Sequence, residues 1–156
     1  MKWIIALVLL TLLASPVAAS AAAVPGADAK THCGVCGMFV QRHPDWLAVL
    51  ELDSAPAQFF CGPKDLFKFV HFPGRYLPDI PRKTIRAIYL KDYYSLEVID
   101  GKTAYFVIGS DVRGPMGNDL VPFARREDAE GFLQDHDGRR LLPFAEITPA
   151  LLRELE

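Results

Sequence analysis

Apolar and polar residues between positions 46 and 73 follow the pattern of two strands and one helix. Trp46–Leu52 alternates apolar and small side chains, which predicts a strand, and Gln58–Cys61 would complete a hairpin after a turn at residues 53–57. A helix is then expected from Gly62-Pro63, because proline fits the first helical turn. Its apolar stripe would consist of Leu66, Phe67, Phe69 and Val70, and it should end near residues 71–73.

The later part of the chain predicts five strands and two helices. Strands are expected at Thr84–Tyr89, Tyr94–Ile99, Ala104–Ile108, Leu120–Phe123 and Arg140–Phe144, and a helix at Arg126–Asp135. Asp100-Gly101 is typical of a two-residue turn, so the second and third of these strands are predicted to pair as a hairpin. Thr148 is expected to cap a short C-terminal helix.

Proline and glycine interrupt this pattern at three places. Met38–Val40 predicts a short strand that must end before Pro44, since proline cannot donate to a strand ladder. A loop rich in proline and glycine is expected at residues 72–81, and residues 114–118 cannot form regular structure.

One spacing occurs twice, each time where a strand is predicted to run into a helix. Phe60-x4-Asp65-x3-Phe69-Val70 is repeated as Phe123-x4-Asp128-x3-Phe132-Leu133. The repeat predicts an α+β fold of two related small strand-strand-helix units (ββα or ββαβ), packed together and built mainly on antiparallel sheet. The two halves would cover residues 31–82 and 83–156.

Residues 1–23 have the layout of an export signal. A basic Lys2 precedes an apolar run from Ile4 to Ala14, and a stretch of small residues ends near Ala23. The run is short for a membrane span, which favours cleavage, with retention as an N-terminal anchor as the alternative. No cysteine that could carry a lipid lies near the expected cut. We therefore predict a periplasmic domain of residues 24–156.

The net charge and the motifs of the chain argue against several classes of function. The formal net charge is -2, and basic residues are scattered among acidic ones, which argues against a nucleic-acid partner. No Ser/His/Asp order, phosphate-binding loop or pair of carboxylates stands out, so we predict that the protein is not an enzyme. Contact with a membrane is expected only through a partner or through an uncleaved N-terminal segment.

Sulfur-bearing residues are the candidate chemistry. The chain has three cysteines, an odd number for an exported protein, so one disulfide would leave a thiol unpaired. Thiolates and thioethers suit the soft ion Cu(I), and the glycines beside the methionines allow the loops to bend toward a common site. The candidate metal ligands are Cys33, Cys36, Met38, Cys61 and Met116.

Three other interpretations of the cysteines stay open. Cys33 and Cys36 could form a disulfide, with Cys61 as a small buried side chain. A structural Cys3His zinc site could be completed by His32, His43 or His71, although the second tight ligand pair of such sites is missing. Thiol-disulfide exchange is the enzymatic alternative, but it normally places the first cysteine at a helix N-terminus, and the residues after Cys36 do not predict a helix.

Several motifs together resemble the nitrous oxide reductase accessory protein family, NosL. They are Cys33-x-x-Cys36-Gly37-Met38-Phe39-Val40, Trp46, the run from Phe59 to Phe67 that contains Cys61-Gly62-Pro63, Tyr89-x-x-Asp92-Tyr93, and Pro115-Met116-Gly117. The resemblance covers nearly all of the mature chain, and the order of the Cys-Gly-Met and Pro-Met-Gly elements is its most specific part.

The resemblance implies a periplasmic Cu(I)-binding metallochaperone, from a family that includes many lipoproteins. Such a protein would deliver copper for nitrous oxide reductase, with a membrane ABC-type transporter complex or the apo reductase as partner. Carried over by position, it implicates Cys36 and Met38, with Cys33 beside them, and Met116. Cys61 belongs to a variant form of the motif.

Overall fold

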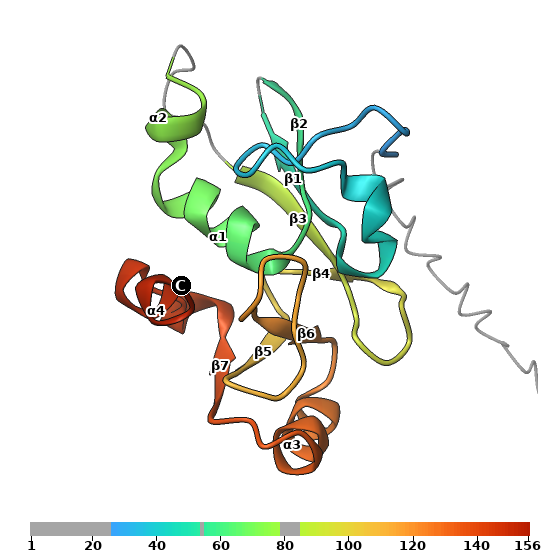
Figure 1. Ribbon diagram of the computed structural model, residues 1–156, viewed down its shortest axis with the longest axis vertical. Helices are drawn as coiled ribbons and strands as arrows, with labels where there is room; N and C mark the ends of the chain where they lie inside the picture. Colours follow the sequence, from blue (N-terminus) through green and yellow to red (C-terminus); the bar gives the residue numbers. More distant parts are fainter. Residues whose placement is uncertain (1–25, 54, 79–84) are drawn as a thin grey trace, which may run out of the picture.

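The computed structural model describes residues 26–53, 55–78 and 85–156 (Figure 1). The predicted export signal at residues 1–23 lies outside the described residues, as does the end of the predicted loop at residues 79–81. Among the helices that are described, none is long and apolar enough to cross a membrane. The described part contains two antiparallel sheets and several short helices, which confirms the predicted α+β class.

The first sheet has four strands in the order β2-β1-β3-β4. Its strands are β1 (Ala48–Leu52), β2 (Ala55–Phe60), β3 (Ile85–Lys91) and β4 (Val98–Asp100). Every neighbouring pair is antiparallel, and Leu50 at the centre lies opposite both Gln58 and Ile88. The predicted hairpin of β1 and β2 is confirmed. Strand β2 begins earlier than predicted, and Pro56 is accepted there because β2 is an edge strand.

Helix α1 (Pro63–His71) follows β2 directly and packs into the largest core cluster. Leu66, Phe67 and Phe69 are buried as predicted, and the Phe67 ring lies 5.3 Å from the Phe106 ring of the second sheet. Burial of each such aromatic side chain contributes about 1.5–3 kcal/mol. Helix α4 (Pro149–Glu154) packs beside α1, and the Thr148 hydroxyl accepts from the Leu151 backbone N–H, which confirms the predicted cap.

The second sheet has three strands in the order β6-β5-β7. They are β5 (Tyr105–Ile108), β6 (Val121–Phe123) and β7 (Arg140–Pro143), and helix α3 (Arg126–Asp135) covers one face (Figure 1). Alternate residues of β5 point to different clusters, since Phe106 and Ile108 join the core around α1 whereas Val107 packs with Phe132 of α3. The second sheet therefore shares a core with the first.

Asp92 and Tyr93, just beyond β3, connect the two sheets. The Asp92 Oδ2 accepts from the Ala124 backbone N–H at 2.8 Å, and the Tyr93 backbone N–H donates to the Pro122 carbonyl at 3.0 Å. The Asp92 Oδ1 accepts from the backbone N–H groups of Tyr94 and Ser95. These residues, part of the sequence motif Tyr89-x-x-Asp92-Tyr93, therefore serve the packing of the sheets.

The predicted hairpin around Asp100-Gly101 is wrong. Strand β4 pairs with β3, and β5 belongs to the other sheet. The Gly101 backbone N–H donates to the Ile88 carbonyl, so the glycine continues the pairing with β3, and a Cβ there would collide with the Ile88 side chain. Glycine is required here for close packing, and the chain then passes to the second sheet.

Two other predicted strands also differ from the structure. Phe39 forms a single bridge with His32, and a 3-10 helix at Val40–Arg42 replaces the strand predicted at Met38–Val40. The strand predicted at Tyr94–Ile99 is reduced to β4, because the Asp92 carboxylate holds residues 94 and 95 in a turn. Two further 3-10 helices lie at Pro44–Trp46 and Phe144–Glu146, and a short helix α2 (Pro73–Tyr76) occupies part of the predicted loop.

The repeated sequence pattern has a physical counterpart. Phe60 packs on Phe69 with ring centroids 5.3 Å apart, and Phe123 packs on Phe132 at 5.0 Å. In both places a phenylalanine at a strand end contacts one on the following helix. The division into halves at residue 82 stays a prediction, and the first sheet draws strands from both sides of it.

Candidate metal centre

Cys33 and Cys36 lie in a tight loop that is fixed by its own backbone. The Cys33 backbone N–H donates to the Met38 carbonyl at 2.8 Å, and the Gly37 N–H donates to the Cys33 carbonyl at 3.0 Å. Gly37 has a φ of 76°, a left-handed conformation that favours glycine. The Gly34 N–H donates to the Phe59 carbonyl, which attaches the loop to β2 two residues before Cys61. The loop therefore presents its thiols toward the start of α1.

Cys61 and Asp65 reach the same point from the start of α1. Cys61 precedes the N-cap residue Gly62, and Asp65 lies in the first turn, where the helix dipole favours an acidic side chain. The four-residue spacing places the two side chains together, with the Cys61 Sγ 3.5 Å from the Asp65 Oδ2.

The three thiols and the carboxylate form one compact cluster. Their ligand atoms all lie within 4.8 Å of one another. The Cys33 Sγ lies 3.3 Å from the Asp65 Oδ2, and the Cys36 Sγ lies 3.5 Å from the Cys61 Sγ. Cys33, Cys61 and Asp65 are buried, whereas Cys36 is exposed. All three cysteines are free thiols in this structure, and the fourth group of the cluster is a carboxylate in place of the histidine that a Cys3His zinc site would need.

The environment separates the proton affinities of the thiols. A hydrogen bond from the Cys61 thiol lowers the pKa of Cys33 to about 6. Burial raises the pKa of Cys36 to about 11, and the hydrogen bond to Cys33 raises the pKa of Cys61. Among the three thiols, Cys33 therefore loses its proton most readily. A soft cation bound to all three sulfurs would displace protons, so acid should weaken its binding.

Met116 lies at the mouth of this cluster. Cys36, Asp65 and Met116 all line one open pocket of about 580 Å³, together with residues from α1, α2 and α4. The Met116 side chain is 40% exposed. The structure therefore brings Met116 to the pocket that leads to the thiols, although it lies 80 positions after Cys36 in the sequence.

Met38 and the histidines that were considered as ligands make other contacts in the structure. Met38 is partly buried and packs against the core cluster that contains Cys33 and Cys61, so its role as a ligand stays a prediction. The His71 ring contacts the Ile147 carbonyl at 2.7 Å, and the His32 ring packs on Phe39. His32, His43 and His71 all lie outside the group of metal-ligating side chains that converge in the described structure.

Asp65 is the residue that the sequence analysis missed as a member of the site. Its side chain is 1% exposed, and its Oδ1 is buried without a hydrogen-bond partner; the Lys68 Nζ is 3.6 Å away. A buried, incompletely satisfied carboxylate beside thiols is unusual, because such groups are normally paired. The four-residue spacing from Cys61 at a predicted helix start is a signal for this contact, but in the sequence analysis the aspartate appears only in the repeat and in the motif run from Phe59 to Phe67.

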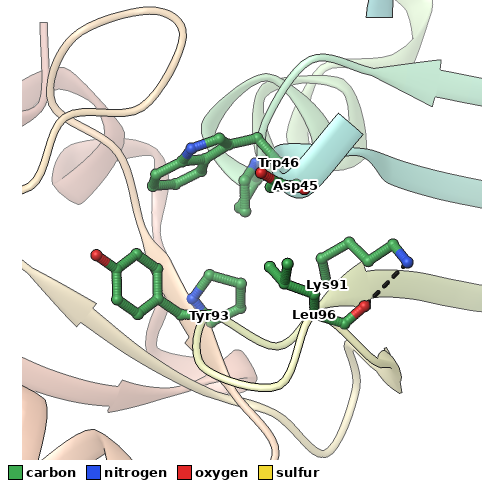
Figure 2. A pocket seen from close by; sticks show the side chains of 7 residues that line it. Asp45, Trp46, Lys91, Tyr93 and Leu96 are labelled. Carbon is green, nitrogen blue, oxygen red and sulfur yellow. Dashed lines mark hydrogen bonds between the residues drawn. The ribbon is translucent and has the colours of Figure 1, made fainter. Parts of the chain in front are cut away.

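A second pocket, of about 230 Å³, lies between the sheets and contains no cysteine (Figure 2). The Trp46 ring lines it from one side, and Tyr93, Leu96 and Lys91 line it from the other. The Lys91 Nζ donates to the Leu96 carbonyl, which fixes this wall. Trp46 and Tyr93 also pack against the cluster around α3. The pocket therefore belongs to the junction of the sheets and is separate from the thiol site.

Asp119 is a buried acid behind the Met116 loop, and its titration should be visible in the stability of the fold. Burial raises the pKa of Asp119 from 3.8 to about 7. The folded protein then keeps this proton at a pH where the unfolded chain has lost it, so the stabilising contribution is complete below pH 4 and is lost as the pH rises to about 7. The loss should be on the order of a few kcal/mol.

Asp119→Asn should remove this pH dependence. Urea denaturation at each pH measures the free energy of unfolding of both proteins. The difference between them, variant minus original, should increase from pH 5 to pH 8. Asp135→Asn, at an exposed acid of α3, is the control for exchanging a carboxyl for an amide away from this buried contact. A constant difference for Asp119→Asn would contradict the expectation.

The fold and the site together define a small α+β protein with a cluster of three thiols, two of them buried, that suits a soft metal ion. The chain belongs to the NosL family, whose model matches residues 25–152. This confirms the resemblance found in the sequence motifs.

Two known proteins with NosL in their names are similar to this chain in sequence. The chain is 30% identical over 126 residues to the "Copper-binding lipoprotein NosL" of Stutzerimonas stutzeri, covering 79% of this chain, and 30% identical over 129 residues to that of Achromobacter cycloclastes, covering 75% of it. It spans 65% and 63% of the lengths of these two relatives.

Two solved structures have the same fold. The crystal structure of the copper chaperone NosL from Shewanella denitrificans matches with a TM-score of 0.69 and 28% identity, over 82% of this chain and 97% of that one. The solution structure of apo-NosL from Achromobacter cycloclastes matches with a TM-score of 0.50 and 27% identity, over 67% of this chain and 87% of that one. The two sequence relatives are named copper-binding lipoproteins and the Shewanella denitrificans structure a copper chaperone, in keeping with the prediction of a non-enzyme.

Proposed function

We propose that this protein binds Cu(I) at the thiol cluster and passes it to a copper-enzyme maturation system. The observation that carries the proposal is the convergence of Cys33, Cys36, Cys61 and the Asp65 carboxylate within 4.8 Å. Three sulfur donors match the preference of Cu(I) for soft ligands and low coordination numbers. The relatives that are named as copper-binding proteins or copper chaperones support copper as the metal.

The arrangement of the sulfurs suits transfer by ligand exchange. Cys33 and Cys61 are buried and would retain the ion, whereas Cys36 is exposed and lines the open pocket with Met116. A partner ligand that enters this pocket could replace Cys36 or a weak thioether before the inner thiolates release the ion. Met38 and Met116 are proposed as the thioether ligands that lower the barrier to this exchange.

The proposed client is nitrous oxide reductase, reached through its membrane ABC-type transporter complex or as the apo enzyme in the periplasm. Family membership supports this proposal. The proposed location is the periplasm, in agreement with the relatives that are named lipoproteins and with the export signal predicted at residues 1–23. A chaperone for another periplasmic copper enzyme would use the same site.

An anaerobic Cu(I) titration of the reduced protein tests the binding. A colorimetric Cu(I) chelator competes for the ion, and its absorbance reports the affinity. We expect binding far tighter than micromolar and a marked loss when Cys36 and Met38 are both replaced. Binding no tighter than micromolar, or no change in that double variant, would refute the proposal.

Thiol-disulfide exchange is the second candidate function, because the pKa of Cys33 is lowered to about 6 and the Cys36 and Cys61 sulfurs are only 3.5 Å apart. A thiol with a lowered pKa is the usual nucleophile of such enzymes. Reduction of insulin disulfides by the metal-free protein, coupled to a thiol reductant, would favour this function. Cu(I) binding without such turnover would favour the chaperone.

A further inference from the structure

Lys64 and Asp119 are two ionisable residues buried between the start of α1 and the loop that carries Met116. Their exposed fractions are 2% and 4%. Burial of a charged group is costly unless its polar atoms are satisfied, so these two side chains need a structural or functional reason. Neither residue belongs to the cluster of side chains proposed to bind copper.

Lys64 holds the backbone of Met116 directly. Its ammonium donates to the Met116 carbonyl at 2.8 Å and to the Leu155 carbonyl at 3.3 Å. Lys64 also lies immediately before Asp65 in the first turn of α1. One buried side chain therefore joins the helix start that contributes Asp65 to the loop that contributes Met116, and Figure 1 shows this loop, between β5 and β6, beside that end of α1.

Asp119 connects the same two segments from the other side, from the Met116 loop to the start of α1. Its Oδ1 accepts from the Lys64 backbone N–H at 2.7 Å and from the Leu120 N–H at 2.8 Å. The carboxylate also packs against two glycines, since a Cβ on either Gly62 or Gly114 would lie 2.6 Å from its Oδ2. The helix start and the loop approach each other as closely as they do only because both have glycine at this contact.

The loop between these contacts is itself closed. The backbones of Gly114 and Gly117 exchange hydrogen bonds of 2.8 and 3.1 Å, and Gly117 has a φ of 85°. The Met116 carbonyl accepts from Lys64, and Met116 is one of the residues that line the pocket together with Cys36. The position of the thioether relative to the thiols thus depends on contacts of its own backbone.

We propose that Lys64 and Asp119 are positioning residues, which hold the Met116 thioether at the mouth of the thiol site so that it takes part in Cu(I) binding. This inference rests on the proposed function, because it assigns a second layer of residues to the same site. If Lys64 served the fold alone, its replacement would lower the stability of the protein, but its effect on Cu(I) affinity would not depend on Met116.

A double-mutant cycle distinguishes the two roles. The Cu(I) affinities of the original protein, Lys64→Met, Met116→Leu and the double variant are measured anaerobically by chelator competition. Loss of an outer support of a metal ligand typically lowers affinity about 10- to 100-fold, so Lys64→Met should approach the loss seen for Met116→Leu. In the Met116→Leu background, Lys64→Met should change the affinity less than about twofold, because no thioether is left to position.

Gly114→Ala provides a second variant if Lys64→Met fails to fold. The added methyl group would displace the loop from Asp119, and the same Met116-dependent loss is expected. Gly131→Ala in α3 is the matched control and should leave the affinity unchanged, since nothing lies within 4 Å of the added Cβ.

The inference is overturned if Lys64→Met and Gly114→Ala bind Cu(I) as tightly as the original protein does. It is also overturned if these variants lose the same Cu(I) affinity with and without Met116. A Met116→Leu variant with unchanged Cu(I) affinity would overturn it as well. The proposed function fails separately, when the original protein shows no tight Cu(I) binding.

Discussion

Replacing Cys33 and Cys61 together by serine is expected to lower the Cu(I) affinity by on the order of a thousandfold or more. These two thiols are 3% and 1% exposed and form the inner part of the cluster. A serine hydroxyl is a hard donor that keeps its proton at neutral pH, so it cannot replace a thiolate for a soft ion. The same chelator competition measures the loss.

Destabilisation must be separated from loss of ligands in this variant, because serine introduces buried hydroxyls. Val40→Thr is the matched control, since Val40 is fully buried in the same core cluster and the change adds a hydroxyl without removing sulfur. We expect a similar shift in thermal unfolding but an unchanged Cu(I) affinity for Val40→Thr. A Cys33→Ser/Cys61→Ser variant that still bound Cu(I) within a few fold of the original would place the site elsewhere.

Asp65→Asn is expected to change stability and copper affinity in opposite directions. The metal-free protein should be stabilised by about 1–3 kcal/mol, because a neutral amide is less costly to bury than a carboxylate whose Oδ1 has no hydrogen bond and only an ion pair with the Lys68 Nζ 3.6 Å away. The Cu(I) affinity should fall about tenfold, since the negative carboxylate beside Cys33 and Cys61 favours a bound cation and the amide carries no charge. Urea denaturation and chelator competition measure the two effects.

Asp128→Asn is the control for this prediction. Asp128 occupies the corresponding position of the repeated sequence pattern, but it is more exposed and pairs with Arg125 on the surface of α3. Exchange of such a surface pair should alter stability by less than about 1 kcal/mol and leave copper affinity unchanged. If Asp65→Asn instead destabilised the metal-free protein, the carboxylate would be part of the fold's own hydrogen bonding rather than a site held ready for a cation.

Asp65 and Asp128 occupy equivalent positions in the sequence repeat but lie in different environments. In both copies of the repeat the structure packs the phenylalanine at the strand end on the one in the following helix. The repeat gave no reason to separate Asp65 from Asp128. Their difference comes from the loop around Cys33, which contacts and buries Asp65, whereas the Asp128 side chain stays 33% exposed beside Arg125.

Asp100-Gly101 shows the same limit for strand pairing. Asp-Gly is a good local signal for a turn, and the chain does turn there, with the Asp100 Oδ1 accepting from the Lys102 backbone N–H. Which strands pair across the turn depends on residues far along the chain. Here Gly101 packs against Ile88, and the pairing of β4 with β3 prevails over the local hairpin.

The sequence alone determined the order of most strands and helices, the α+β class, the inventory of sulfur donors and the resemblance to the NosL family. Periodicity, turn residues and motif order are local properties, so they can be interpreted without coordinates. The tertiary structure alone decided that Asp65 joins the three thiols, that Cys36 is the exposed one, and that Lys64 and Asp119 hold the Met116 loop. Apart from the contact of Asp65 with Cys61, four positions away, these features depend on segments separated by 25 to 91 positions, whose contacts follow from the packing of the two sheets around α1.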